Sequence, residues 1–148
     1  MATDMCTQMG LEVNTLSQLD QDNVRRQLSP SIKEIATCLN PVDLTGSSAD
    51  DDFVAAANAL AESRDIDVLL LLLLPYFPGC SPDLGAMLSQ VALRHGKPMV
   101  AYVPRLDKYR MLIEGFEIYG IPVAHSIEGA VHMAAALKRY GKARGVCG

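Results

Sequence analysis

Apolar residues recur with the spacing of a helix in four segments of the chain. After Ser47-Ser48 the apolar positions are i, i+3, i+4, i+7 and i+8, which share one helix face; they are Phe53, Ala56, Ala57, Leu60 and Ala61. Similar stripes begin after Ser81, Asp107 and Ser126. The pattern therefore predicts four amphipathic helices in the second and third thirds of the chain.

Residue types at the predicted helix ends support these helices. Three acids, residues 50–52, stand in the first turn of the first helix, where the helix dipole favours negative charge. In the second helix Ser81 suits the N-cap, Pro82 suits the first helical position, and Gly96 ends the helix. The third helix is expected to stop at Gly120.

Short apolar runs separate the predicted helices, at residues 66–74, 98–103 and 121–124. None of them alternates apolar with polar positions, as a strand with one solvent-facing side would. Continuous apolar runs between amphipathic helices are typical of strands covered on both faces, so we predict a mostly parallel α/β sheet. The leucine run has helical propensity, but its short length and the flanking Asp67 and Pro75 favour a strand.

The N-terminal part is predicted to be helical, with a short helix that Gly10 closes and a surface helix from Ser17 to Leu28. Ser29-Pro30 should end the second of these. A further strand is expected just ahead of the small residues "TGSS". We predict one domain over residues 1–148, made of a helical lead-in, an α/β core and a flexible tail at 1–39, 40–140 and 141–148.

Composition narrows the class of partner. Of the 148 residues 49% are hydrophobic and 5% aromatic, and the formal net charge is -4. A basic field that could hold nucleic acid is therefore not expected. The apolar run is far shorter than the roughly 20 residues that cross a bilayer, and the first ten residues do not form a secretory signal.

The cysteines indicate neither a metal site nor a disulfide framework. They are Cys6, Cys38, Cys80 and Cys147, without a Cys-x-x-Cys pair and without a histidine at metal-ligand spacing. Reduced thiols are typical of the cytosol. We therefore predict a cytoplasmic protein that binds no metal, no nucleic acid and no membrane.

Two loops between predicted strands and helices are built from small or capping residues: "DLTGSS" at 43–48 and "PGCSPD" at 78–83. Ligands of open parallel sheets sit beyond the carboxyl ends of the strands, and free amides at a helix N-terminus can hold an anion. Such loops also occur where nothing binds, and the acids at 50–52 would repel an anion. Neither loop matches the P-loop or the dinucleotide pattern.

Single residues leave alternatives open. Asp43 can orient its loop or touch substrate, and Cys80 can be a thiol activated by a helix N-terminus or a small packing residue. His125 is the histidine placed on the loop side of the sheet, whereas His95 and His132 look like surface residues. No nucleophile stands beside a base, so this domain alone does not look like a complete enzyme.

The order of several segments resembles one domain of the nucleoside-diphosphate-forming acyl-CoA synthetases, relatives of succinyl-CoA synthetase. The segments are "ATDMCTQMGLEV", "NPVDLTGSSADDDF", "DVLLLLLLPYFPG", "KPMVAYV" and "GIPVAHSIEGAVHMAAAL". Of these segments, "NPVDLTGS" is the most specific to the family. The resemblance implies a three-layer flavodoxin-like CoA-ligase domain, similar to the carboxy-terminal part of the succinyl-CoA synthetase β chain.

The resemblance also implies a function. The family interconverts acyl-CoA, ADP and phosphate with acid, CoA and ATP, through a phosphohistidine carried by another domain. The complete enzyme would use ATP or ADP, Mg²⁺ and CoA, and the partners would be CoA-binding, phosphohistidine and ATP-grasp domains. Here the implied phosphoryl- or acyl-binding residues are Thr45, Gly46, Gly79, Cys80 and Ser81, with Asp43 orienting their loop. The resemblance assigns no catalytic residue, His125 included.

The chain departs from the family at its start, because it begins at Met1-Ala2 without the Gly-rich segment that usually precedes "ATD". It is expected to be a domain excised from a longer chain, or a separate protein that lost this segment. The alternative function is a stand-alone binding or regulatory module without catalysis. The acyl substrate, the nucleotide and a homo-oligomeric state stay open. A bulky residue at position 79 is expected to slow phosphoryl transfer and leave the fold intact.

Overall fold

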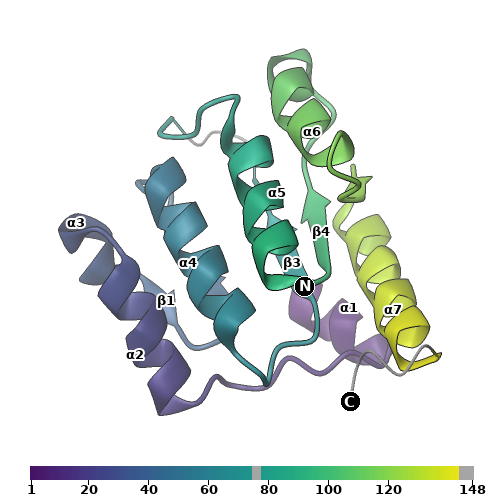
Figure 1. The fold of residues 1–148 in the computed structure, drawn as a ribbon, viewed down its shortest axis with the longest axis horizontal. Coiled ribbons are helices and arrows are strands. Elements are labelled where there is room, and N and C mark those ends of the chain that lie inside the picture. The colour runs from purple at the N-terminus through teal and green to yellow at the C-terminus, as the bar shows by residue number, and fades with distance from the viewer. Residues whose placement is uncertain (75–77, 144–148) are drawn as a thin grey trace.

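The computed structural model describes residues 1–74 and 78–143, which contain both helices and strands (Figure 1). In chain order the elements are α1 (Ala2–Gln8), α2 (Gln18–Gln27), α3 (Pro30–Lys33), β1 (Thr37–Cys38), β2 (Val42–Asp43), α4 (Asp50–Glu62), β3 (Leu69–Leu72), α5 (Leu84–His95), β4 (Met99–Tyr102), η1 (Asp107–Tyr109), α6 (Arg110–Glu117), β5 (Val123–Ala124) and α7 (Ile127–Ala143). No helix within the described ranges has both the length and the apolar character needed to cross a membrane.

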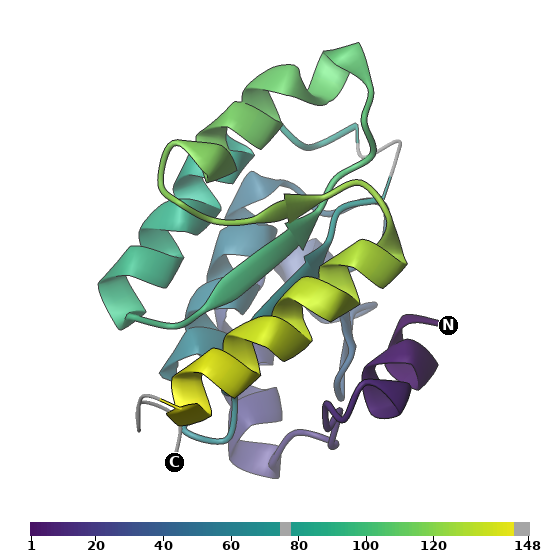
Figure 2. The same ribbon diagram turned by 90° about the vertical axis from the view of Figure 1, so that its right-hand side faces the viewer.

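The central sheet is parallel and has the order β3-β4-β5. Leu69 lies opposite Met99, and Ala101 lies opposite Val123. Helices cover both faces, with α7 on the side opposite to α5 and α6 (Figure 2). This arrangement confirms the predicted three-layer α/β fold.

The leucine run forms β3 and shows why its positions do not alternate in polarity. Leu69 and Leu73 belong to the core that α4, α5 and α6 build on one face. Leu70 packs on the other face, against the core that includes Ala130 and Ala134 of α7. Successive strand side chains point to opposite faces, so a strand buried on both needs apolar residues throughout.

The strand predicted before "TGSS" is present as β2, but it is not part of the parallel sheet. It pairs with β1 in an antiparallel ribbon, with Thr37 opposite Asp43. Beside this ribbon, α2 and α3 pack on α4 through Val24, Leu28 and Ile32. The expected helical lead-in therefore also contributes a strand. Of the expected flexible tail, residues 141–143 continue α7 and residues 144–148 lie outside the described residues.

α4 begins with the acids 50–52 in its first turn, as predicted, whereas the start of α5 differs from the predicted one. At α4 the N-cap is Ala49, and the Ser48 hydroxyl instead donates to the Thr45 carbonyl at 2.9 Å. At α5 the helix begins at Leu84 rather than at Pro82, and Ser81 Oγ accepts the Asp83 amide at 3.2 Å. The serines thus shape the loops rather than cap the helices.

Asp52 ties α4 to the lead-in and should make stability depend on pH. The residue is buried, and its carboxylate accepts the Ser29 amide at 2.9 Å and the Ala49 amide at 3.2 Å. Burial raises the pKa of Asp52, but the hydrogen bonds from Ser29 and Ala49 lower it more, so the net pKa is lowered.

A lowered folded-state pKa means that Asp52 stabilises the fold fully above its unfolded pKa of about 3.9. This contribution is lost as the pH falls through the folded value. Asp52→Asn should lose about 1–3 kcal/mol at pH 7 and show a shallower loss of stability on acidification below about pH 4. Urea denaturation at stepped pH measures both. Asp51→Asn, exposed in the same helical turn, is the control; equal pH profiles for the two variants would contradict the role of Asp52.

Candidate functional site

The two loops predicted to form a site lie against each other where α4 and α5 begin (Figure 1). A Cβ atom placed on Gly79 would lie 2.6 Å from the Ser48 carbonyl oxygen and 3.3 Å from Ala49 Cα. The backbones of the 43–48 and 78–83 loops are therefore in direct contact. Both loops emerge at the same rim of the fold, as expected.

Hydrogen bonds within the 43–48 loop fix its shape. Asp43 Oδ1 accepts the Thr45 amide at 2.9 Å, and Thr45 Oγ1 accepts the Ser47 amide at 3.4 Å. Thr45 has a φ of 66°, a left-handed conformation that local hydrogen bonding helps a non-glycine residue to adopt. Gly46 has open space around it, because a Cβ there would meet nothing within 4 Å. This side of the loop can be approached by a second molecule.

The 78–83 loop is joined to α4 by Asp50. Asp50 Oδ1 accepts the Ser81 amide at 2.9 Å, and Asp50 Oδ2 accepts a short hydrogen bond from the Ser81 hydroxyl. Both donors of Ser81 are thus held by a carboxylate of the chain itself. The acids that were expected to repel an anion include one that occupies the position an anion would take at Ser81.

Of the two roles left open for Cys80, the structure supports a packing residue and not an activated thiol. Burial, and after it the negative charge of Asp50, raises the pKa of Cys80 to about 11. The side chain packs against the core formed by α4, α5 and α6. The alternative of a lowered thiol pKa is wrong, since at neutral pH a group with this pKa carries almost no thiolate.

A cleft of about 480 Å³ opens between the 78–83 loop and the start of α6. Its described lining residues are Pro78, Cys80, Ser81, Pro82, Lys108, Tyr109 and Leu112. Sequence reasoning missed the last three. The signal that could have found them is their place directly after β4, because neighbouring parallel strands send their following loops to the same edge.

The structure thus divides the predicted site residues into two groups. Gly79 packs against the 43–48 loop that contains Thr45 and Gly46, whereas Cys80 and Ser81 line the cleft. His125 lies at the carboxyl end of β5, as predicted, and its Nδ1 donates to the Val103 carbonyl at 2.9 Å. It is not among the described lining residues of the cleft.

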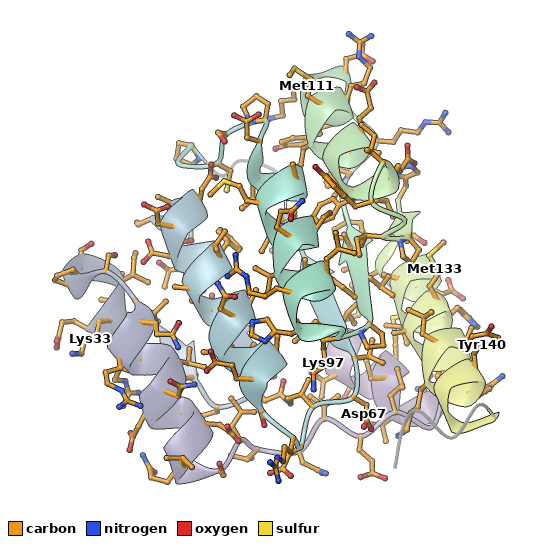
Figure 3. All side chains as sticks on the ribbon, viewed as in Figure 1. Lys33, Asp67, Lys97, Met111, Met133 and Tyr140 are labelled. Atoms are coloured by element: carbon orange, nitrogen blue, oxygen red, sulfur yellow. The ribbon has the colours of Figure 1, made fainter. Side chains whose placement is uncertain are left out.

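Lys97 lies at the end of the sheet opposite to these two loops (Figure 3). Its Nζ donates to the carbonyl oxygens of Ser63 and Ile66, which bridges the connections that precede β3 and β4. Within the described ranges, no three histidine, cysteine or carboxylate side chains gather as metal ligands would.

No protein-family model and no curated protein matches the chain. Among solved structures, it is similar to the dinucleotide forming acetyl-coenzyme A synthetase 1 of Ca. Korarchaeum cryptofilum, with a TM-score of 0.77 and 19% identity. The same protein in complex with phosphate and ADP gives the same values. The chain is also similar to PH0766 from Pyrococcus horikoshii OT3, with a TM-score of 0.80 and 25% identity.

These likenesses cover 99% and 95% of this chain, but only 31% and 32% of the two longer proteins. The chain therefore spans about a third of the length of the proteins that it matches. The expected resemblance to a domain of acyl-CoA synthetases is confirmed at the level of the fold.

Proposed function

We propose that this chain is one domain of a nucleoside-diphosphate-forming acyl-CoA synthetase. The complete enzyme would interconvert acyl-CoA, ADP and phosphate with acid, CoA and ATP through a phosphohistidine on another domain. Partner domains would bind CoA, carry the phosphohistidine and hold the nucleotide in an ATP-grasp fold. The chain alone would not catalyse the reaction.

The observation that carries this proposal is the contact between the two loops at Ser48 and Gly79. It brings two loop–helix junctions to one rim of the fold. Such an arrangement suits a domain that supports chemistry performed elsewhere. The similar Korarchaeum protein is an acetyl-CoA synthetase whose structure was solved with phosphate and ADP, and this chain matches only a third of it.

Residue roles in the proposal follow the geometry. Thr45 and Gly46 would present the open side of their loop to the phosphoryl group or acyl carboxylate, with Asp43 holding the loop in shape. Gly79 would keep the second loop close to the first, and Cys80 would contribute backbone rather than thiol. Ser81 would take part only when Asp50 releases it. ATP or ADP, Mg²⁺ and CoA would bind to the complete enzyme.

An assay of ATP formation tests the proposal. The chain alone, with acetyl-CoA, ADP, Mg²⁺ and phosphate, should form no ATP. Adding the CoA-binding, phosphohistidine and ATP-grasp domains from the same organism should start ATP formation. ATP made by the chain alone would contradict its dependence on partners, and no ATP with any such set of domains would contradict the function.

Gly46→Val tests the role of the first loop. The side chain would point into open space, so the fold should stay intact while the approach of the phosphoryl group is blocked. The rate of ATP formation by the assembled enzyme should fall by about 10- to 100-fold, as a misplacement of about 1 Å can cause. An unchanged rate with an unchanged melting temperature would remove Gly46 from the site.

A further inference from the structure

One edge of the parallel sheet is formed by β3, which pairs with β4 on one side only. The amides of Leu69 and Leu73 donate to backbone carbonyls on the β4 side at 2.9 and 3.0 Å. Successive residues of a strand direct their backbone groups to opposite sides, so the amides and carbonyls of Leu70 and Leu72 point away from β4. In the part of the chain that the structure describes, no strand pairs with this outer edge.

The side chains of β3 leave apolar surface open beside this edge. Leu70, Leu71 and Leu72 are only partly buried, whereas the first three residues of the central strand β4 are fully buried. Leu71 packs against the core that α4, α5 and α6 build, and Leu70 packs against the core on the α7 side. Apolar surface is therefore left uncovered on both faces of the strand.

The free edge of β3 has none of the usual protection against pairing with another chain. Edge strands are commonly blunted by a charge, a proline or a very short length. Residues 68–74 read "VLLLLLL" and contain neither a charged residue nor a proline. By contrast, β5 at the other edge has two residues and directly follows Pro122. This contrast favours an edge at β3 that is paired in the working protein.

We propose that the outer edge of β3 binds an extended segment of a partner polypeptide, which adds one strand to the parallel sheet. The backbone of the segment would pair with Leu70 and Leu72, as in other complexes formed by strand addition. Its side chains would be apolar at successive positions rather than at alternate ones, because apolar cores lie on both faces of β3. β3 has four residues, so a segment of similar length would cover it.

The further domains of the proposed synthetase are the source of this segment, so the identity of the partner rests on the proposed function. This chain matches about a third of each of the two longer solved proteins. The rest of such a polypeptide is available for contacts of this kind. The open edge itself is a property of this chain, so it can be tested without the partner.

Hydrogen exchange of the whole chain, followed by NMR, tests the proposal with the peptide Lys-Lys-Val-Ile-Val-Ile-Lys-Lys. Saturating peptide should slow the exchange of the Leu70 and Leu72 amides at least tenfold. The amides of Leu69 and Leu73, which already donate on the β4 side, should change little. Slower exchange confined to other parts of the fold would overturn the proposal.

Two altered peptides separate the backbone contacts from the side-chain contacts. Methylation of the four central backbone nitrogens keeps the side chains but removes the donors, and should weaken binding at least tenfold. Replacing both isoleucines with serine keeps the donors but makes one face polar, and should also weaken binding at least tenfold. Equal binding of the methylated peptide would overturn strand addition, and equal binding of the serine peptide would overturn the contact with both cores.

Leu72→Pro removes one outward amide, and an edge strand tolerates proline where the missing donor faces solvent. Leu72→Ala is the matched control, because it also shortens the side chain but keeps the amide. Peptide binding to Leu72→Pro should be at least tenfold weaker than binding to Leu72→Ala, and equal affinities would overturn pairing through this edge. Should Leu72→Pro unfold, the methylated peptide gives the same decision without any change in the chain.

Sedimentation without peptide distinguishes a partner from a second copy of this chain. A monomer whose Leu70 and Leu72 amides exchange rapidly supports the proposal, whereas a dimer that protects these amides would assign the edge to a second copy and overturn it.

The two proposals fail separately. Peptide binding as described, together with no ATP formation by any assembled set of domains, would leave the strand site assigned and remove the synthetase function. ATP formation by the assembled enzyme, together with no protection of Leu70 and Leu72 by the peptide, would keep the function and remove this inference.

Discussion

Gly85→Ala is expected to lower the free energy of unfolding by about 3 kcal/mol, near the upper end for an overpacked core. A Cβ atom on Gly85 would lie 2.1 Å from the Leu112 carbonyl oxygen and 3.1 Å from its carbonyl carbon. These are backbone atoms of α6, so no side-chain rotation can relieve the contact. Alanine favours a helix over glycine by only about 1 kcal/mol, which is too little to offset the clash.

The same contact is seen from α6, where a Cβ on Gly115 would lie 2.7 Å from the Ala86 amide nitrogen. Adding a methyl group at either position must push α5 and α6 apart. Phe116 and Leu88, which are fully buried between layers, would then lose packing. The loss is therefore expected to spread through the core rather than stay local.

Urea denaturation followed by circular dichroism measures this effect. Gly115→Ala should also lower the free energy of unfolding. The double variant should lose less stability than the two single variants added together, because both changes separate the same helix–helix contact. Gln90→Ala on the exposed side of α5 should stay within about 0.5 kcal/mol of the natural protein. A loss below about 1 kcal/mol in Gly85→Ala would mean that the two helices are not held at this distance.

The second large effect is expected from Gly79→Ala, which should destabilise the fold by about 2–3 kcal/mol and abolish ATP formation by the assembled enzyme. A side chain here meets the Ser48 carbonyl at 2.6 Å. Ser48 is fully buried and bonded to Thr45, so it has no room to retreat. The earlier expectation, that a bulky residue at position 79 leaves the fold intact, does not agree with this contact.

Gly46→Ala is the matched control for this variant, since it makes the same chemical change on the facing loop without a neighbour within 4 Å. Its melting temperature should stay close to that of the natural protein, while that of Gly79→Ala should fall by several degrees. Equal melting temperatures for the two variants would mean that the loops are not in contact. If Gly79→Ala is less stable but fully active in the assembled enzyme, the loop contact is structural and does not support catalysis.

Local patterns were enough to predict the layers of this fold. Runs such as Leu69–Leu72 and Met99–Tyr102 are apolar at every position, and both are strands with cores on two sides. The left-handed Gly96 and Gly120 follow helices where the pattern placed their ends. Each of these signals depends on neighbours within a few residues.

The features that sequence reasoning missed depend on residues far apart in the chain. Asp50 reaches Ser81, and Asp52 reaches Ser29, across 31 and 23 positions. The cleft joins Cys80 to Leu112, which lie in different loop–helix units. Helical spacing and cap propensities carry no information on such pairs, so the contacts of Asp50 and Asp52 could not be predicted.

Ser89 has a consequence for how the cleft can adapt. Its single hydroxyl lies 2.8 Å from the Gly85 carbonyl oxygen and 3.1 Å from that of Gly115, so it links α5 to α6 at the point where their backbones touch. The two sides of the cleft therefore belong to helices that are held together. A hinge motion that moved α6 away from α5 would break the hydrogen bond between Ser89 and the Gly115 carbonyl, so the structure opposes widening of the cleft by this motion.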